Sequence, residues 1–165
     1  MRHSMKGFSF KVLAAATLLS FASAAALADD TVATRTEGKT PAYPGIPNSS
    51  VAAFGGQPGI DLWVDLLFKW ILLDNRINQI FVTHGHVERQ KALNKELENM
   101  VMGGPAHYSG ASMSAAHAEL GITLTEFNAV VEDAYLACDE ARTPYTVCNQ
   151  LIAALAPFER AIVTR

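Results

Sequence analysis

The chain has 165 residues, of which 50% are hydrophobic and 18% charged, with 11 Gly, 7 Pro and 2 Cys. This composition excludes collagenous, disulfide-rich and wholly disordered proteins, and it favours one globular domain. The formal net charge is −3, and because Arg2, Lys6 and Lys11 are the only charged residues before Asp29, removal of residues 1–28 would change it to −6. No basic surface is apparent, so we expect no nucleic-acid partner.

The segment 1–28 has the pattern of a cleaved signal peptide. Basic residues precede an apolar stretch, 12–26, and Ala26-Leu27-Ala28 supplies a small-x-small cleavage pattern. The stretch is shorter than the roughly 20 residues of a membrane-spanning helix, although an uncleaved anchor is the alternative. We therefore predict cleavage after Ala28, export to the periplasm and no membrane span in the mature chain.

Residues 29–50 are polar and contain Pro41, Pro44 and Pro47. Such a segment buries too little apolar surface to order itself, so we predict a flexible linker. The remaining residues, 51–165, are predicted to form a domain whose small core would gain stability from a bound cofactor.

The domain shows helical periodicity and no alternating strand pattern. Pro58 suits a first turn, and apolar residues recur at helical spacing over 60–71, which predicts a helix ending near residues 74–75. An irregular stretch is expected next, containing Phe81 and the two histidines of segment 84–86.

The next predicted helix covers residues 87–102 and has a thin apolar face. It stops at Gly103-Gly104-Pro105, where glycine and proline end a helix. A polar loop, 106–112, then leads to a short helical turn over 113–120.

Two further helices are predicted at the C-terminal end. Thr123 and Glu126 form a capping box that starts the first of them. The second is predicted to start with Thr143 as its cap and Pro144 in its first turn, and its apolar stripe reaches Ile162.

Several short motifs follow one another in a characteristic order. They are Phe54-Gly55-Gly56, Ile80-Phe81, Val87-Glu88-Arg89-Gln90, Gly103-Gly104-Pro105-Ala106-His107-Tyr108-Ser109-Gly110, the segment 113–123, residues 127–131, and the closing segment 156–163. Two Gly-Gly pairs at this spacing, together with a Met-x-x-x-His-x-x-x-Gly-Ile pattern, are specific. In these motifs the chain resembles the group 1 truncated haemoglobins over essentially all of residues 51–165.

The resemblance implies an all-α truncated globin, a two-over-two helical sandwich around a haem, with most of the proximal helix replaced by a loop. It also implies that His117 is the proximal ligand of the iron of haem b. A neutral imidazole is a suitable single ligand, and it leaves the iron five-coordinate with an open face for a gas. Without the resemblance, His117 would be read as an ordinary surface or partly buried side chain.

On the distal side the resemblance places Phe68, Gln90 and Asn94 over the iron, with Leu93 beside them. Family members usually carry Tyr where this chain has Phe68, so one hydrogen-bond donor is missing. Gln90 and Asn94 are four residues apart on one helix face, and both amides can donate into the pocket, the alternative being solvated helix residues. In some relatives a His at the position of Leu93 can bind the iron and so close the distal site. Leu93 cannot bind the iron, which predicts that a gas can enter and leave this site.

Further residues are expected to surround the porphyrin. Those implied to pack against it are Phe81, Leu97, Met113, Phe127 and Val130, and Tyr108 is expected at the ring edge or a propionate, with simple packing as its alternative. Two other truncated groups carry Trp in place of Val130, which favours group 1. A metal pair at His84 and His86 is a weaker interpretation than two solvated loop histidines.

The two cysteines predict a disulfide. Cys138 and Cys148 each lie on the apolar stripe of a helix, about one turn before and after the connection between the two helices. An oxidising periplasm would let the bond form and persist. Two buried thiols are the alternative.

These features predict a haem-binding truncated globin that reversibly binds oxygen or another diatomic ligand, nitric oxide or carbon monoxide. The alternative function is an enzyme, a nitric oxide dioxygenase or haem peroxidase. Such an enzyme must return its iron to the ferrous state, and no flavin motif is visible, so it would need a separate electron donor. Binding is therefore the favoured function, and the sequence leaves the oligomeric state open.

Overall fold

The computed structural model describes residues 50–165, so the predicted signal peptide and all of the predicted linker except Ser50 lie outside the described residues. The elements in this part of the chain are helices, with one isolated parallel bridge between Ile122 and Val163. They are α2 (Ser50–Ala53), α3 (Gly56–Leu73), α4 (Asn78–Thr83), α5 (Val87–Val101), α6 (Met113–His117), α7 (Leu124–Ala141), α8 (Tyr145–Leu155), the 3-10 turn η2 (Ala156–Phe158) and α9 (Glu159–Ile162).

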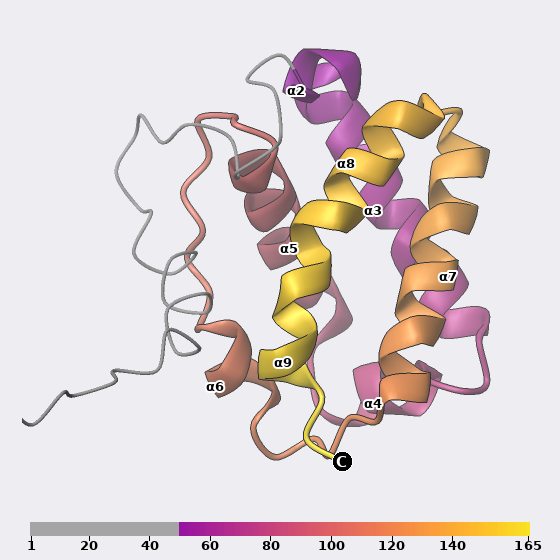
Figure 1. Ribbon diagram of the computed structural model, residues 1–165, viewed down its shortest axis with the longest axis vertical. Coiled ribbons are helices and arrows are strands. Elements are labelled where there is room, and N and C mark those ends of the chain that lie inside the picture. The colour runs from indigo at the N-terminus through magenta and orange to yellow at the C-terminus, as the bar shows by residue number, and fades with distance from the viewer. Residues whose placement is uncertain (1–49) are drawn as a thin grey trace, which may run out of the picture.

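Four long helices form two layers of two. Helix α3 packs on α5 and α7 packs on α8, while further contacts of α3 with α7 and of α5 with α8 join the two pairs. Figure 1 shows α8 crossing in front of α3, between α5 and α7. The predicted two-over-two helical sandwich is confirmed.

Helix α3 supplies much of the core because its apolar residues repeat at helical spacing. Six of them are buried: Ile60, Trp63, Val64, Leu67, Phe68 and Ile71. The helix begins after Gly55, whose φ of 95° is a left-handed conformation that favours glycine. Gly59 is also required, since a Cβ at this position would collide with the backbone carbonyl of Phe54.

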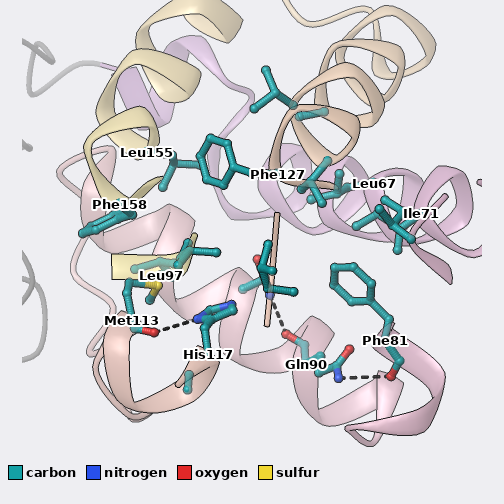
Figure 2. A pocket seen from close by; sticks show the side chains of 18 of the residues that line it. Leu67, Ile71, Phe81, Gln90, Leu97, Met113, His117, Phe127, Leu155 and Phe158 are labelled. Atoms are coloured by element: carbon teal, nitrogen blue, oxygen red, sulfur yellow. Dashed lines mark hydrogen bonds between the residues drawn. The ribbon is translucent and has the colours of Figure 1, made fainter. Parts of the chain in front are cut away.

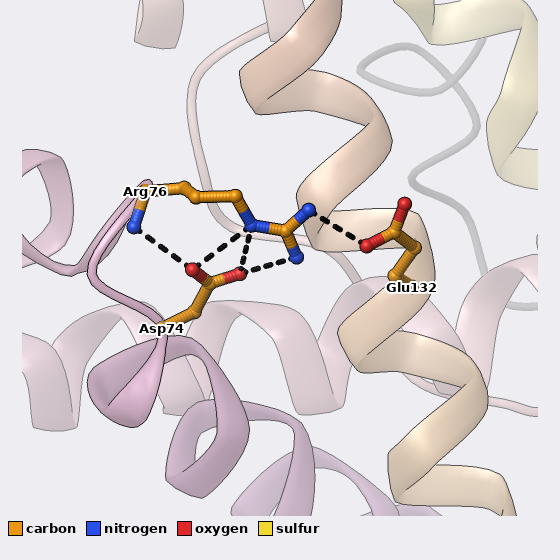
Figure 3. Close-up of polar contacts among 3 residues, drawn as sticks. All are labelled: Asp74, Arg76 and Glu132. Atoms are coloured by element: carbon orange, nitrogen blue, oxygen red, sulfur yellow. Dashed lines mark hydrogen bonds and ion pairs between the residues drawn. The ribbon is translucent and has the colours of Figure 1, made fainter.

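The corner between α3 and α4 is fixed by Arg76 (Figure 3). Its guanidinium contacts Asp74 Oδ2 through Nη2 at 2.6 Å and Glu132 Oε2 on α7 through Nη1 at 2.7 Å. The hydrogen bonds from Arg76 lower the pKa of Asp74 below its usual value. The end of α3 is thereby tied to the opposite layer.

Two sequence predictions are wrong at helix ends near the C-terminus. Thr143 does not cap α8: its backbone N–H donates to Cys138 O and closes α7, after Arg142 has adopted a left-handed φ of 56°. Pro144 therefore stands at the N-cap of α8 rather than in its first turn. The last helix also does not run unbroken to Ile162, because a 3-10 turn containing Pro157 divides it.

The stretch around Phe81 was predicted to be irregular, and this is also wrong. It forms the six-residue helix α4, which has no buried residue and no side-chain cap. The sequence signals that predict a helix, a buried stripe and a capping residue, are therefore both missing here. At the start of the described residues, Ser50 is buried and begins α2.

The capping box and the disulfide are confirmed. Thr123 Oγ1 accepts a hydrogen bond from Glu126 N, and the Glu126 carboxylate accepts one from Thr123 N. Cys138 and Cys148 are joined, with their Cα atoms 6.2 Å apart, which fastens α7 to α8. Within residues 50–165, no helix combines the length and apolar character needed to cross a membrane.

Candidate functional site

A cavity of about 330 Å³ lies between the two helical layers and α6. Figure 2 shows side chains from α3 to α8 directed into it. The structure brings every predicted site residue to this cavity: Phe68, Phe81, Gln90, Leu93, Asn94, Leu97, Tyr108, Met113, His117, Phe127 and Val130. Most of its wall is aliphatic or aromatic, so it suits a large apolar ligand.

His117 reaches the cavity from the short helix α6. Ser112 caps this helix by accepting a hydrogen bond from Ala115 N. His117 Nδ1 lies 2.7 Å from Met113 O. Because a carbonyl only accepts, Nδ1 carries the proton of the neutral ring and the lone pair is on Nε2. In Figure 2 the second ring nitrogen points away from Met113, toward the cavity.

This bond to Met113 supplies what the sequence alone did not provide, the partner that orients the imidazole. A hydrogen bond to one ring nitrogen holds the tautomer and raises the basicity of the other nitrogen, as around histidine metal ligands. The donor set is therefore one oriented imidazole in an apolar surrounding, which fits the iron of a haem group.

The wall contributed by α3, α4 and α5 contains aromatic rings and two amides. Phe68 is 1% exposed and meets Phe81 edge to face, with ring centroids 5.9 Å apart. Gln90 Nε2 donates to Phe81 O at 3.3 Å, and Asn94 Nδ2 donates to Gln90 O at 2.9 Å. Each amide nitrogen therefore donates one N–H to the backbone and has one further N–H.

Four further residues with polar groups line the cavity, and sequence reasoning did not place them there. They are Trp63, His84, Glu98 and Glu126. Burial raises the pKa of Glu98 to about 8, whereas hydrogen bonds from the backbone and hydroxyl of Thr123 lower that of Glu126. Glu98 follows Gln90 and Asn94 at intervals of four, and this spacing is the signal that could have identified it.

The two loop histidines separate in the structure. His84 lines the cavity, while His86 Nδ1 accepts a hydrogen bond from Arg89 N at 3.4 Å and caps α5. Over residues 50–165, no group of three or more His, Cys, Asp or Glu side chains is arranged to hold a metal ion by itself.

Comparison with known families agrees with this geometry. The family model of bacterial-like globin matches residues 51–164. The chain belongs to the bacterial-like globin family. This globin is 33% identical over 103 residues to a group 1 truncated hemoglobin of Synechocystis, a match that covers 60% of the chain and 82% of the relative. A match to a group 1 truncated hemoglobin of Tetrahymena thermophila, 32% identical over 79 residues, covers 48% of the chain but only 64% of that relative.

The globin also shares its fold with solved structures. The 2/2 hemoglobin of a Synechococcus species, solved in the cyanomet state with covalently attached heme, superposes with a TM-score of 0.65 at 25% identity, covering 70% of this chain and 98% of that one. The cofactor of this globin is haem with its iron, and the cavity between the layers, with its one oriented imidazole, fits that group.

Proposed function

We propose that this globin reversibly binds oxygen or another diatomic gas at a five-coordinate haem iron, with His117 as the proximal ligand. The observation that carries this proposal is the 2.7 Å contact of His117 Nδ1 with Met113 O, which leaves Nε2 to face an apolar cavity. When bound, the haem iron supplies one open coordination position for a gas.

The chain's own residues hold the haem and act on a gas within the cavity. Phe81, Leu97, Met113, Phe127 and Val130 exclude water from it, and Tyr108 closes its edge with its hydroxyl donating to Ala111 O at 3.0 Å. Gln90 and Asn94 each keep one N–H for a polarised ligand. Leu93 has no donor atom, so the side facing the gas stays open to exchange.

The test is the optical spectrum of the purified protein after reconstitution with haemin, in the ferric, ferrous and carbon monoxide forms. We expect a haem band in each state, and a ferrous form whose bound carbon monoxide is released again when the gas is removed. A protein that gives no haem band after reconstitution contradicts the proposal.

We further propose that the globin is exported to the periplasm after cleavage behind Ala28. The Cys138–Cys148 disulfide supports this, because such bonds persist in oxidising compartments. Mass spectrometry of protein from the periplasmic fraction should find an N-terminus at Asp29. A full-length chain recovered only from the cytoplasm would contradict export.

A further inference from the structure

The cavity reaches solvent at its rim, where a polar side chain stands. Within residues 50–165, the lining residues that are exposed to solvent are His84, Ala116 and Ala156, and of these only His84 has a polar side chain. No Lys or Arg from this part of the chain lines the cavity. A negatively charged group at the rim would therefore meet the imidazole of His84.

The backbone around His84 is fixed by the contact between α4 and α5. The backbone N–H of His84 donates to Ile80 O at 3.2 Å and closes α4. Gln90 Nε2, on α5, donates to Phe81 O at 3.3 Å. Gly85 lies so close to the same amide that a Cβ at position 85 would collide with Gln90 Nε2. The turn that carries His84 is thus held against α5, while the residue itself is exposed.

The haem that fits this cavity has two kinds of surface. Its porphyrin body is apolar, and one edge carries two propionate groups, each a carboxylate near neutral pH. Moving a carboxylate from water into an apolar interior is costly unless the charge is paired. The porphyrin body therefore suits the apolar walls, and the propionates suit the rim. There an imidazole N–H can donate to a carboxylate, and such charge-assisted hydrogen bonds are stronger than neutral ones.

Two other ionisable residues of the cavity wall are less suited to bind a propionate. The Tyr108 hydroxyl has one proton and donates it to Ala111 O at 3.0 Å. Hydrogen bonds from the backbone and hydroxyl of Thr123 lower the pKa of Glu126, so this residue is a carboxylate and repels another one. The imidazole of His84, in contrast, offers an N–H in either protonation state.

We propose that His84 is a binding residue for the haem, and that its imidazole donates a hydrogen bond to a propionate carboxylate at the cavity rim. This inference rests on the proposed function, because it concerns the haem that binds through His117. The two histidines hold the same group at different points, His117 at the iron and His84 at the edge of the ring. His84 therefore slows the loss of haem and leaves the coordination of the iron unchanged.

The rate of haem loss tests this role. Haemin is transferred from the loaded protein to an excess of apomyoglobin, and the change in the optical spectrum gives the dissociation rate. His84→Leu removes the donor and should speed haem loss roughly 2- to 5-fold, an effect typical of one exposed charged contact. His84→Arg keeps a donor and adds a permanent positive charge, so it should lose haem no faster than wild type.

His86→Asn is the matched control, because His86 is also exposed but does not line the cavity. His86 Nδ1 accepts the hydrogen bond from Arg89 N that caps α5, and Asn keeps an acceptor for this cap. His86→Asn should therefore lose haem at the wild-type rate.

The same rates measured with haemin dimethyl ester identify the group that His84 contacts. The esterified propionates carry no charge, so wild type and His84→Leu should lose this cofactor at equal rates. A crystal structure of the haem-loaded wild type should also place a propionate oxygen about 3 Å from a ring nitrogen of His84.

Equal rates of haemin loss in wild type and His84→Leu, or an equally large effect with the dimethyl ester, overturn the propionate contact. A ferric spectrum that changes from low-spin to high-spin in His84→Leu also overturns it, by showing that His84 binds the iron. Failure of the wild type to take up haemin instead contradicts the proposed function. If His84→Leu does not fold, the position of the propionates in the wild-type crystal structure decides the matter.

Discussion

At the level of single residues, we predict that haem retention depends on one nitrogen atom of His117. We expect His117→Ala to lose haem during gel filtration, or to give a ferrous spectrum that lacks a proximal imidazole, because no other cavity group is an oriented imidazole of this kind. Added imidazole should restore the wild-type ferrous spectrum in part.

His107→Ala is the matched control, since His107 is exposed on the loop before α6 and lies outside the cavity wall. His107→Ala should retain haem and give the same ferrous spectrum as wild type. Ferrous and carbonyl spectra of His117→Ala that equal those of wild type would exclude His117 as the ligand.

Phe68 lines the cavity from α3, and its ring carries no hydrogen-bond donor. Because its ring is buried in the cavity against Phe81, Phe68→Tyr would place a hydroxyl there. A new hydrogen bond of ~1 to 2 kcal/mol should slow oxygen release by very roughly 5- to 30-fold. Stopped-flow oxygen release measures this, with Phe68→Leu as the control that adds no donor. An unchanged release rate in Phe68→Tyr would show that this ring does not face the gas.

Glu98 makes the stability of the fold depend on pH. Its pKa rises from an ordinary 4.5 to about 8 in the folded chain, so the folded state binds this proton more tightly than the unfolded state does. The free energy of unfolding therefore falls as pH rises through this interval, by ~1.4 kcal/mol per unit at most, and levels off above it. Urea unfolding between pH 5 and pH 9 should show the decline in wild type and much less of it in Glu98→Gln.

Asp133 is a second buried carboxyl, with which the effect of Glu98 on the free energy of unfolding can be compared. It is 3% exposed, and burial, aided by the charge of Asp74, raises its pKa from 3.8 to about 6. Because the pKa of Asp133 is also raised, Asp133→Asn should make the decline between about pH 4 and pH 6 shallower, leaving there only the part that Glu98 causes, and should leave the decline above pH 6 in place. A Glu98→Gln profile parallel to wild type above pH 6 would contradict a protonated Glu98.

At the level of secondary-structure elements, the disulfide joins α7 and α8 beside the cavity. The ring of Trp63 lines the cavity, and its Nε1 lies 3.1 Å from Cys138 Sγ. Replacing both cysteines by Ala should lower the free energy of unfolding by ~2 to 3 kcal/mol, because the short loop between them is no longer closed in the unfolded chain. Urea denaturation followed by Trp fluorescence measures this.

Reduced wild type provides the control for that variant. It should unfold at the same urea concentration as the double Ala variant if loss of the cross-link is the cause. Mass spectrometry after denaturation and alkylation without reductant should find no modified Cys in the wild-type protein. Two alkylated thiols would contradict the bond.

At the level of the whole molecule, the cavity makes stability depend on the cofactor. A space of about 330 Å³ inside so small a domain gives its lining side chains fewer packing contacts on the side that faces the cavity, and bound haem would supply these contacts. Haem that binds only the folded chain should stabilise it by ~2.7 kcal/mol at a free concentration 100 times its Kd. Scanning calorimetry should therefore show a Tm roughly 10 °C higher for the haem-loaded protein than for the apoprotein.

The variant His117→Ala should show a much smaller rise in Tm when haemin is added. Equal Tm values for apoprotein and haem-loaded wild type would mean that the cavity does not take up the cofactor in the folded chain.

The sequence by itself determined the elements whose signals are local. The apolar repeat of α3, the Thr123–Glu126 capping box and the glycines after α5 each act within one or two turns, so they could be read from neighbouring residues. The spacing of Cys138 and Cys148 around a short connection likewise predicted their bond. His117 and the other predicted cavity residues were found through motifs whose order is typical of one family.

Only the tertiary structure decided what depends on contacts between distant residues. Helix α4 has neither stripe nor cap of its own, and the corner that precedes it is tied by Arg76 to Glu132 on α7. Its neighbours in sequence predict that Thr143 is an N-cap, but in the structure its backbone N–H donates to Cys138 O at the end of α7. Glu98 is an ordinary helix carboxyl in sequence, and its burial at the cavity is what raises its pKa, because the cost of removing a charge from water depends on what packs around it.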